Sequence, residues 1–212
     1  IGVEKIYQPD NPEKIQESDI EIGSNENTNK MVAVLFTDID GFTSLSELLE
    51  PDQIIELLSE YQDKMVKPIF KNLGTVDKFI GDAVMATFGT PVSQGNDAQN
   101  AFSCAREMQI AMNQWAKERS ENGLPAISHR IGIHYGECIV GNIGTEDRKE
   151  YTVVGDTVNV ASRICEVGKE LKASLIFSEE VRVRLLEDVN TRIETNVTLK
   201  GKEKGLKLHC LD

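Results

Sequence analysis

The sequence predicts an α+β fold, an α/β sandwich with a ferredoxin-like βαββαβ core to which further strands and helices are added. One observation behind this prediction is the apolar run MVAVLFTDI, which begins at Met31 and suits a central strand covered on both faces. Another is a pair of long stretches with apolar residues at helical spacing. A third is Gly81-Asp82 between TVDKFI and AVMATF, which is typical of a two-residue type II′ hairpin.

The first part of the chain differs in composition and apolar periodicity from the rest. Residues 1–30 are acidic with little apolar periodicity, and we expect a linker or tail there. The folded domain is predicted over residues 31–212. Because the chain begins with Ile1 rather than Met, we expect an upstream regulatory domain or membrane anchor in a longer protein. No apolar run reaches the roughly 18 residues of a membrane span and no secretory signal pattern occurs, so the expected location of this domain is the cytoplasm.

Helices are expected after the first strand and after the hairpin. Thr43 or Ser44 can cap a first helical segment, and Pro51 opens a longer helix that ends near residues 72–74. The apolar residues of that helix recur at helical spacing: Ile54, Ile55, Leu58, Tyr61 and Met65. A second long helix is predicted over residues 97–121, with one apolar stripe: Ala101, Ala105, Met108, Met112 and Trp115.

The second half of the chain alternates short strands and helices. RIGIHYG and CIVGNIG are predicted as a pair of strands, followed by the charged excursion TEDRKE and a short strand, YTVVG. Further along, DTVNVASRICEVGKEL predicts a helix, LIF a strand, SEEVRVRLLE a helix, and the end two more strands. Helices cover one face of a βαββαβ sheet, so we expect the other face to be open and a second copy of the chain to cover it.

Composition excludes some classes of partner. The formal net charge is −12, with 27% charged and 40% apolar residues. A nucleic-acid or anionic-membrane binder needs concentrated Lys and Arg, so neither partner is expected. An anionic small ligand stays compatible, because a few local cations and a bound metal can reverse the field in one cleft. The cysteines lie far apart without a CxxC pair and are expected to be buried thiols: Cys104, Cys138, Cys165 and Cys210.

Two aspartates follow apolar runs beside a glycine: Asp38 in FTDIDGFT and Asp82 in DKFIGDAVM. If the first strand lies beside the hairpin, the two carboxylates meet at one edge of the sheet and repel unless a cation lies between them. Hard oxygen ligands that leave room for water and phosphate favour Mg²⁺ or Mn²⁺. The alternative is that Asp38 caps a helix and Asp82 serves the turn.

Other metal and nucleotide motifs are absent. Matching Asp40, Gly41 and Glu47 to a calcium loop would leave Phe36 where a carboxylate is required. Neither GxxxxGK[ST] nor a strand-linked GxGxxG occurs, which disfavours a P-loop or Rossmann site. Phosphate would instead be held by amides near residues 39–42, by metals and by separate basic residues.

Asn159 and Arg163 are four residues apart in the predicted helix DTVNVASRICEVGKEL and therefore lie on one face. One interpretation is a solvated surface. The apolar neighbours Val158, Val160 and Ala161 favour a functional role instead. In that role the planar guanidinium would present fixed donors to phosphate oxygens.

Five stretches occur in order between about residues 31 and 211: FTDIDGFT, VDKFIGDAVM, GIHYGECIVGNIG, VVGDTVNVASR and LKGK. On these motifs the chain resembles the catalytic domain of the class III nucleotidyl cyclases, the family of adenylate and guanylate cyclases. The resemblance implies the class III cyclase fold and the cyclisation of a nucleoside triphosphate, with release of pyrophosphate. It also implies two Mg²⁺ or Mn²⁺ ions in each active site.

The resemblance assigns roles residue by residue. Asp38 and Asp82 match the metal-binding aspartates, and the Ile39 carbonyl matches an additional ligand. Arg163 matches the arginine that steadies charge on the α-phosphoryl group, and Asn159 matches the asparagine that orients the ribose. These assignments make Arg163 and Asn159 the candidate catalytic residues.

Three further positions are implied for substrate binding. Lys200, in LKGK, matches the lysine that binds the outer phosphates. Gly41 and Phe42 lie in the segment after the first strand where phosphate is expected. Asp40 falls at a position that the family fills variably and is not counted among the site residues.

Lys78 and Thr152 match the pair that reads the purine. Lysine only donates and adenine N1 accepts, while a threonine hydroxyl can accept from the exocyclic amine, so the pair favours ATP. Guanylate cyclases of the family typically carry Glu in place of Lys78. A hydroxyl can also donate, so Thr152 is expected to allow some GTP turnover. Many adenylate cyclases carry Asp at this position; the threonine resembles the bicarbonate-responsive subgroup, which makes bicarbonate a candidate activator.

In this family the residues of one site come from two subunits, so the resemblance implies a symmetric homodimer with two composite sites. TEDRKE would then belong to an arm that reaches across to the other subunit of the dimer. Two alternatives stay open: a guanylate cyclase, and a regulatory module that binds a nucleotide without converting it. A palm-type diguanylate cyclase is disfavoured, because IGDAV stands where GG[DE]EF would be expected.

Overall fold

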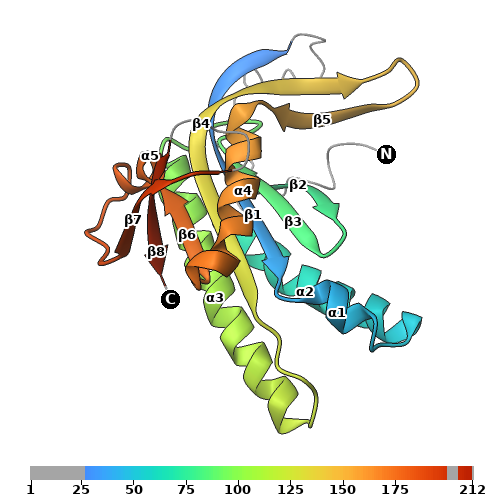
Figure 1. The fold of residues 1–212 in the computed structure, drawn as a ribbon. Helices are drawn as coiled ribbons and strands as arrows, with labels where there is room; N and C mark the ends of the chain where they lie inside the picture. The colour runs from blue at the N-terminus through green and yellow to red at the C-terminus, as the bar shows by residue number, and fades with distance from the viewer. Residues whose placement is uncertain (1–26, 200–204, 212) are drawn as a thin grey trace.

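The fold is described here from a computed structural model, in which residues 27–199 and 205–211 are placed. One mixed sheet runs through it in the order β2-β3-β1-β4-β6-β8-β7, and β5 pairs with β4 beside this path (Figure 1). The strands are β1 (Thr28–Ile39), β2 (Thr75–Ile80), β3 (Ala83–Phe88), β4 (His129–Gly144), β5 (Lys149–Val154), β6 (Leu175–Ser178), β7 (Arg192–Val197) and β8 (Leu206–Leu211). The β1-α-β2-β3-α-β4 core confirms the predicted ferredoxin-like pattern within an α+β fold.

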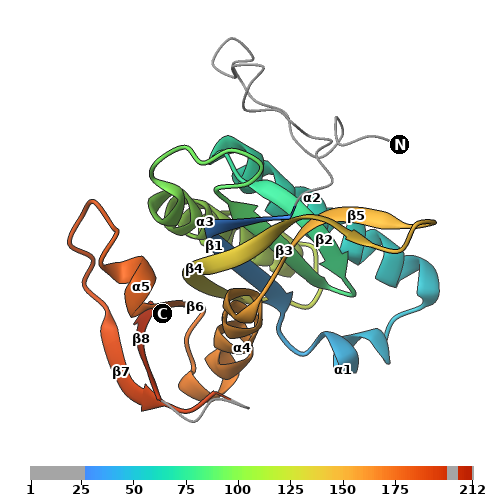
Figure 2. The same ribbon diagram turned by 90° about the horizontal axis from the view of Figure 1, so that it is seen from above.

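The helices lie on both faces of this sheet. They are α1 (Phe42–Ser46), α2 (Pro51–Lys71), α3 (Asp97–Glu121), α4 (Asp156–Leu171) and α5 (Glu179–Arg182). The long helices α2 and α3 pack on one face, and α4 packs on the other (Figure 2). The expectation that helices cover only one face was therefore wrong, because α4 buries its apolar stripe against β1 and β4.

The central strand β1 is covered on both faces, as its continuous apolar run predicted. It pairs antiparallel with β3 on one side and with β4 on the other. Ala33 and Leu35 face the core under α2 and α3, whereas Val32 and Val34 face the core under α4. This strand lies beside the β2–β3 hairpin. The predicted meeting of Asp38 and Asp82 at one edge of the sheet requires that arrangement.

The start of α2 follows its sequence closely. Pro51 is the first helical residue, and Glu50 with Gln53 forms a capping box before the first turn. The buried stripe differs from the one expected, because Ile55 is 64% exposed and Leu57 is buried instead. The short helix α1 also begins two residues earlier than a cap at Thr43 would place it, with Gly41 at the N-cap rather than a threonine or serine.

The predicted hairpin and second long helix are confirmed. Gly81 has φ 63°, in the left-handed region that a type II′ turn requires at its first central position. Helix α3 spans the predicted residues, and its buried stripe contains all the expected members. The four cysteines are free and buried, as expected.

Two predictions about the second half were wrong. RIGIHYG and CIVGNIG form one continuous 16-residue strand, β4, rather than a pair. The first of the two expected strands ends at Gly136, whose lack of a side chain serves a close approach: a Cβ there would lie 2.5 Å from Thr157 Oγ1 of α4. The helix expected over SEEVRVRLLE is limited to α5, which ends at Arg182.

The far half of β4 extends beyond the helices as an arm. It pairs antiparallel with β5, and the residues of TEDRKE connect and begin that pairing (Figure 1). Large apolar side chains are exposed on this arm and on β2: Ile139, Val154, Phe79 and Ile80. Part of the surface therefore stays apolar even though α4 covers the middle of the second face.

Candidate active site

Asp38 and Asp82 come together where β1 and the β2–β3 hairpin end. The Ile39 amide donates to Asp82 Oδ2 at 3.2 Å, which places the second carboxylate beside the first. The pKa of Asp38 is raised from 3.8 to about 7, chiefly because burial removes water from the carboxylate and then because Asp82 adds a hydrogen bond and a like charge. The two side chains thus form a pair that binds a shared proton or a cation more readily than two exposed aspartates would.

Sequence reasoning missed Arg130, which lies opposite Asp38 in the β1–β4 register. Its Nη2 donates to Asp38 Oδ2 at 3.2 Å, and its Nη1 donates to Asp40 Oδ1. Ser128 Oγ also donates to Asp40, at 2.6 Å. The signal available in the sequence was an arginine at the start of RIGIHYG, an apolar strand otherwise. Arg130 lowers the pKa of Asp38, but burial and Asp82 outweigh it.

The donor set fits a divalent cation that shares its coordination with a substrate. Across residues 27–199 and 205–211, no group of three or more His, Cys, Asp or Glu side chains is arranged to hold a metal. Two mutually repelling carboxylates, with the neighbouring Ile39 carbonyl, supply a few hard oxygen ligands and leave other positions open. Mg²⁺ and Mn²⁺ suit such a site, because phosphate and water oxygens can complete their octahedral coordination.

Lys78 and Thr152, far apart in sequence, come together at Asp77. Lys78 Nζ lies 3.3 Å from Asp77 Oδ1 and 3.4 Å from Glu150 Oε2. Thr152 Oγ1 lies 2.8 Å from each carboxylate oxygen of Asp77. The pair that the resemblance assigns to the purine therefore shares one buried carboxylate.

Helix α4 carries Asn159 and Arg163 on one face, as their spacing predicted. Asn159 is exposed and Arg163 is half-buried. No hydrogen bond or ion pair of either side chain is found within the part of the chain that the structure describes; the cation on Asp38 is Arg130. Lys200 lies outside the described residues.

The segment after β1 offers fewer free amides than expected. The Ile39 amide is bonded to Asp82, and the Asp40 amide donates to the Ser128 carbonyl at 2.9 Å. Both amides are bonded within the fold. Of the four residues expected to donate backbone N–H groups to phosphate, only Gly41 and Phe42 stay candidates. Gly41 has φ 69°, a left-handed conformation that favours glycine between the strand and α1.

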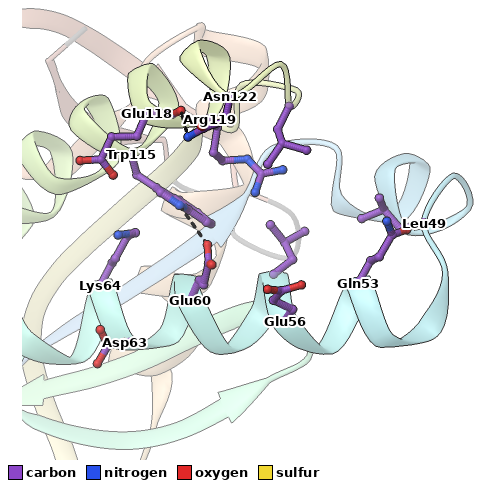
Figure 3. A pocket seen from close by; sticks show the side chains of 12 residues that line it. Leu49, Gln53, Glu56, Glu60, Asp63, Lys64, Trp115, Glu118, Arg119 and Asn122 are labelled. Atoms are coloured by element: carbon purple, nitrogen blue, oxygen red, sulfur yellow. Dashed lines mark hydrogen bonds between the residues drawn. The ribbon is translucent and has the colours of Figure 1, made fainter.

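A separate cavity lies between α2 and α3 (Figure 3). It has a volume of about 440 Å³, and among the residues that line it Trp115 donates from Nε1 to Glu60 Oε2 at 3.1 Å. None of the predicted site residues lines it. A cavity of about 460 Å³ next to Arg130 and Gly41 lies at the aspartate end instead.

Comparisons with known proteins agree with this geometry. Residues 25–212 match the family described as "Adenylate and Guanylate cyclase catalytic domain". The chain belongs to this family. It is similar to an adenylate cyclase of Anabaena cylindrica, with 40% identity over 90% of this chain and 38% of that protein. It is also similar to adenylate cyclase 1 of Rhizobium meliloti (strain 1021), with 34% identity over 84% of this chain and 27% of that protein. The chain thus spans well under half of these relatives.

Solved structures include cyclases of both base specificities. The adenylyl cyclase CyaB from P. aeruginosa matches with a TM-score of 0.81 and 34% identity, over 88% of this chain and 96% of that one. The guanylyl cyclase Cya2 matches with a TM-score of 0.79 and 34% identity, over 87% and 92%. Overall similarity therefore does not separate ATP from GTP, and the base-reading residues must carry that argument.

None of the helices in the described residues combines the length and the apolar content that crossing a membrane would require.

Proposed function

We propose that this domain is an adenylate cyclase, which converts ATP into 3′,5′-cyclic AMP and pyrophosphate. The observation that carries the proposal is the shared contact of Lys78 and Thr152 with Asp77, at 3.3 Å and 2.8 Å. It supports a base pocket with a lysine donor beside a threonine hydroxyl. Adenine offers an acceptor at N1 and a donor at its 6-amino group, which matches that pair.

In the reaction, the ribose O3′ attacks the α-phosphorus. A bond forms between O3′ and that phosphorus, the bond to the oxygen bridging the β-phosphorus breaks, and pyrophosphate leaves with the electron pair. Asp38, Asp82 and the Ile39 carbonyl would hold two Mg²⁺ or Mn²⁺ ions. When bound, these ions would acidify the 3′-hydroxyl and neutralise the departing phosphates.

The protein side chains supply orientation and charge. Arg163 would donate to the α-phosphoryl oxygens as negative charge builds there, and Asn159 would orient the ribose. Lys200 and the backbone near Gly41 and Phe42 would hold the outer phosphates. Arg130 keeps Asp38 and Asp40 in fixed positions through its two donated hydrogen bonds.

Each active site is proposed to form between two copies of the chain. The supporting observations are that Arg163 makes no bond to Asp38 or Asp82 among the described residues, and that large apolar side chains are exposed on β2 and on the β4–β5 arm. Burial of such a surface in a symmetric dimer would be favourable. The arm is the element that would reach across to the partner.

One assay tests the activity. The purified domain is incubated with ATP or GTP and Mg²⁺ or Mn²⁺, and the product is identified by chromatography against both cyclic nucleotides. Cyclic AMP as the main product supports the proposal. Predominant cyclic GMP would favour the guanylate cyclase alternative, and binding without product would favour a silent nucleotide-binding module.

A mixing experiment tests the shared site. Asp38→Ala and Arg163→Ala chains are each expected to be inactive. In a mixed dimer, one of the two composite sites escapes both substitutions, so mixing should restore part of the activity. Absence of recovery in dimers shown to have exchanged subunits would contradict the two-chain site.

The wider setting is proposed from the same relatives. We place this domain in the cytoplasm, where ATP is available, and place a regulatory domain upstream, since the matched relatives are much longer than this chain. Bicarbonate is a candidate activator because Thr152, at the position matched to base recognition, resembles the bicarbonate-responsive subgroup of the family. Activity that stays constant across added bicarbonate at fixed pH would exclude that activation.

A further inference from the structure

Asp77 is a buried carboxylate that links two distant strands. It lies in β2, its side chain is only 4% exposed, and it contacts Thr152 of β5, a strand that pairs with β4 and not with β2. Thr152 is also buried, and its Oγ1 lies 2.8 Å from both Oδ1 and Oδ2 of Asp77. A short contact of one hydroxyl with both oxygens of one carboxylate leaves little freedom in the position of either group.

The chemistry of the two groups determines the direction of this hydrogen bond. An ionised carboxylate only accepts, so the single hydroxyl hydrogen of Thr152 must point to Asp77. Burial raises the pKa of Asp77, while the bonds from Thr152 and the charge of Lys78 oppose that rise and stabilise the ionised form. With its hydrogen used, Thr152 Oγ1 can offer only lone pairs to a ligand.

The same carboxylate also positions the other base-reading group. Lys78 Nζ lies 3.3 Å from Asp77 Oδ1, and an ammonium group only donates. The pair therefore presents a donor from Lys78 next to an acceptor from Thr152. Adenine offers an acceptor at N1 and a donor at its 6-amino group, whereas guanine offers N1–H and O6, the reverse at both positions.

We propose that Asp77 is a positioning residue for base selectivity, which acts by holding the hydroxyl of Thr152 as an acceptor. The inference rests on the proposed adenylate cyclase function and deepens it. A threonine with a free hydroxyl could turn and donate to guanine O6. Asp77 removes that option, so selectivity for adenine is expected to be stricter than Thr152 by itself would allow.

Asp77→Asn is the variant that tests the direction of the bond. The carboxamide has nearly the same shape, but its amino group can donate to Thr152 Oγ1 and free the hydroxyl hydrogen for guanine O6. We expect the ratio of kcat/KM for GTP to kcat/KM for ATP to rise about tenfold, the size of one hydrogen bond made or lost in a buried site. Asp77→Ser, which also donates as well as accepts, should shift the ratio in the same direction and serves if the asparagine variant does not fold.

Thr152→Val closes a double-mutant cycle. Valine keeps the shape and removes the hydroxyl, so Asp77→Asn in the valine background has no hydroxyl hydrogen to redirect. The GTP to ATP ratio of the double variant should then equal that of Thr152→Val within about twofold. A full shift of the ratio in the valine background would show that Asp77 acts by another route and would overturn the inference.

Glu150→Gln is the matched control. Glu150 also contacts Lys78, at 3.4 Å, but it is exposed and does not bond Thr152. Its neutralisation should leave the GTP to ATP ratio unchanged. Equal shifts in Glu150→Gln and Asp77→Asn would assign the effect to charge near Lys78 and would contradict orientation of the hydroxyl.

Purine ribonucleoside triphosphate, which lacks the 6-amino group, reports on the acceptor directly. The unaltered domain should prefer ATP over this analogue, and Thr152→Val should lose most of that preference. A purely structural defect in Asp77→Asn would lower kcat/KM for ATP and GTP by one common factor, leave the ratio unchanged and refute the inference. The proposed function fails separately, if the unaltered domain does not make cyclic AMP.

Discussion

Asp38 at the end of β1 and Asp77 in β2 both carry a carboxylate whose pKa is raised first by burial, and they differ in what surrounds them. The next contributions at Asp38 are the hydrogen bond and the like charge of Asp82, and the pKa rises to about 7 in spite of Arg130. At Asp77 the next contributions come from Thr152 and Lys78, which donate and lower the pKa.

These surroundings give the two carboxylates different roles. Asp38 is available to bind a cation, whereas Asp77 holds neighbouring side chains in place. Asp38 gains most from a divalent cation, because a cation relieves both desolvation and repulsion from Asp82. Asp77 is already bonded on both oxygens and has little to gain from a further ligand. We therefore propose a role in the chemistry for Asp38 and a positioning role for Asp77, and three of the experiments below test that distinction.

The largest effect is expected on turnover. Asp38→Asn and Asp82→Asn should each lower kcat with ATP and Mn²⁺ by about a hundredfold or more, because a cation held near the reacting phosphorus loses an anionic ligand. Steady-state product formation measures this. Asp63→Asn, in an exposed ion pair with Lys67 on α2, is a matched loss of one carboxylate and should change kcat by less than about twofold. Normal turnover in Asp82→Asn would contradict the metal role.

A third buried group, His129, predicts a large effect on stability rather than turnover. Burial lowers its pKa from 6.5 to about 3, so between these values the unfolded chain takes up a proton that the folded chain does not. The free energy of unfolding should therefore fall as pH decreases, by about 2 kcal/mol between pH 7 and pH 5 from this residue. Urea unfolding at both pH values measures the fall.

The control for that prediction is His129→Asn, which can keep a hydrogen bond to Thr37 but does not titrate. Its stability should fall by about 2 kcal/mol less than that of the unaltered domain over the same pH interval. Equal falls in both proteins would show that other groups cause the pH dependence.

Neutralising the two aspartates should change stability by different amounts. Without divalent cations, Asp38→Asn removes the repulsion from Asp82 and should raise the free energy of unfolding at pH 7.5 by about 1 kcal/mol, a value reduced for its partial exposure. At Asp77 the bonds from Thr152 and Lys78 offset much of the cost of burying the carboxylate, so Asp77→Asn should change the free energy of unfolding by less than about 0.5 kcal/mol. Equal increases in both variants would remove the distinction between them.

The smallest effect links cation binding to pH. Since Asp38 has a pKa of about 7 in the cation-free protein, binding must displace a proton at and below that pH. Manganese affinity measured by calorimetry should fall about tenfold from pH 8 to pH 6, with an apparent heat that depends on the ionisation enthalpy of the buffer. Asp38→Asn should bind weakly and lose the pH dependence. A pH-independent affinity in the unaltered domain would contradict the raised pKa.

Much of the fold could be predicted because its signals are local. The apolar run of β1, the periodicity of α3 and the glycine of the β2–β3 turn each act over a few residues. The aspartate pair could also be predicted, because both carboxylates follow strands that the core topology makes neighbours. The errors fall where local signals are ambiguous: two strands were expected on either side of Gly136, but this glycine lies inside β4, close to Thr157.

The sequence by itself determined the ferredoxin-like core, and it predicted metal ligands at Asp38 and Asp82 and a base-reading pair at Lys78 and Thr152. Only the tertiary structure decided that α4 covers the second face, that Arg130 bonds Asp38, and that Asp77 directs the hydroxyl of Thr152 across 75 residues of sequence. The physical reason is the sequence separation over which each interaction acts. Helical and strand periodicity depend on near neighbours, whereas the direction of a buried hydrogen bond depends on which acceptor the folded chain places beside it.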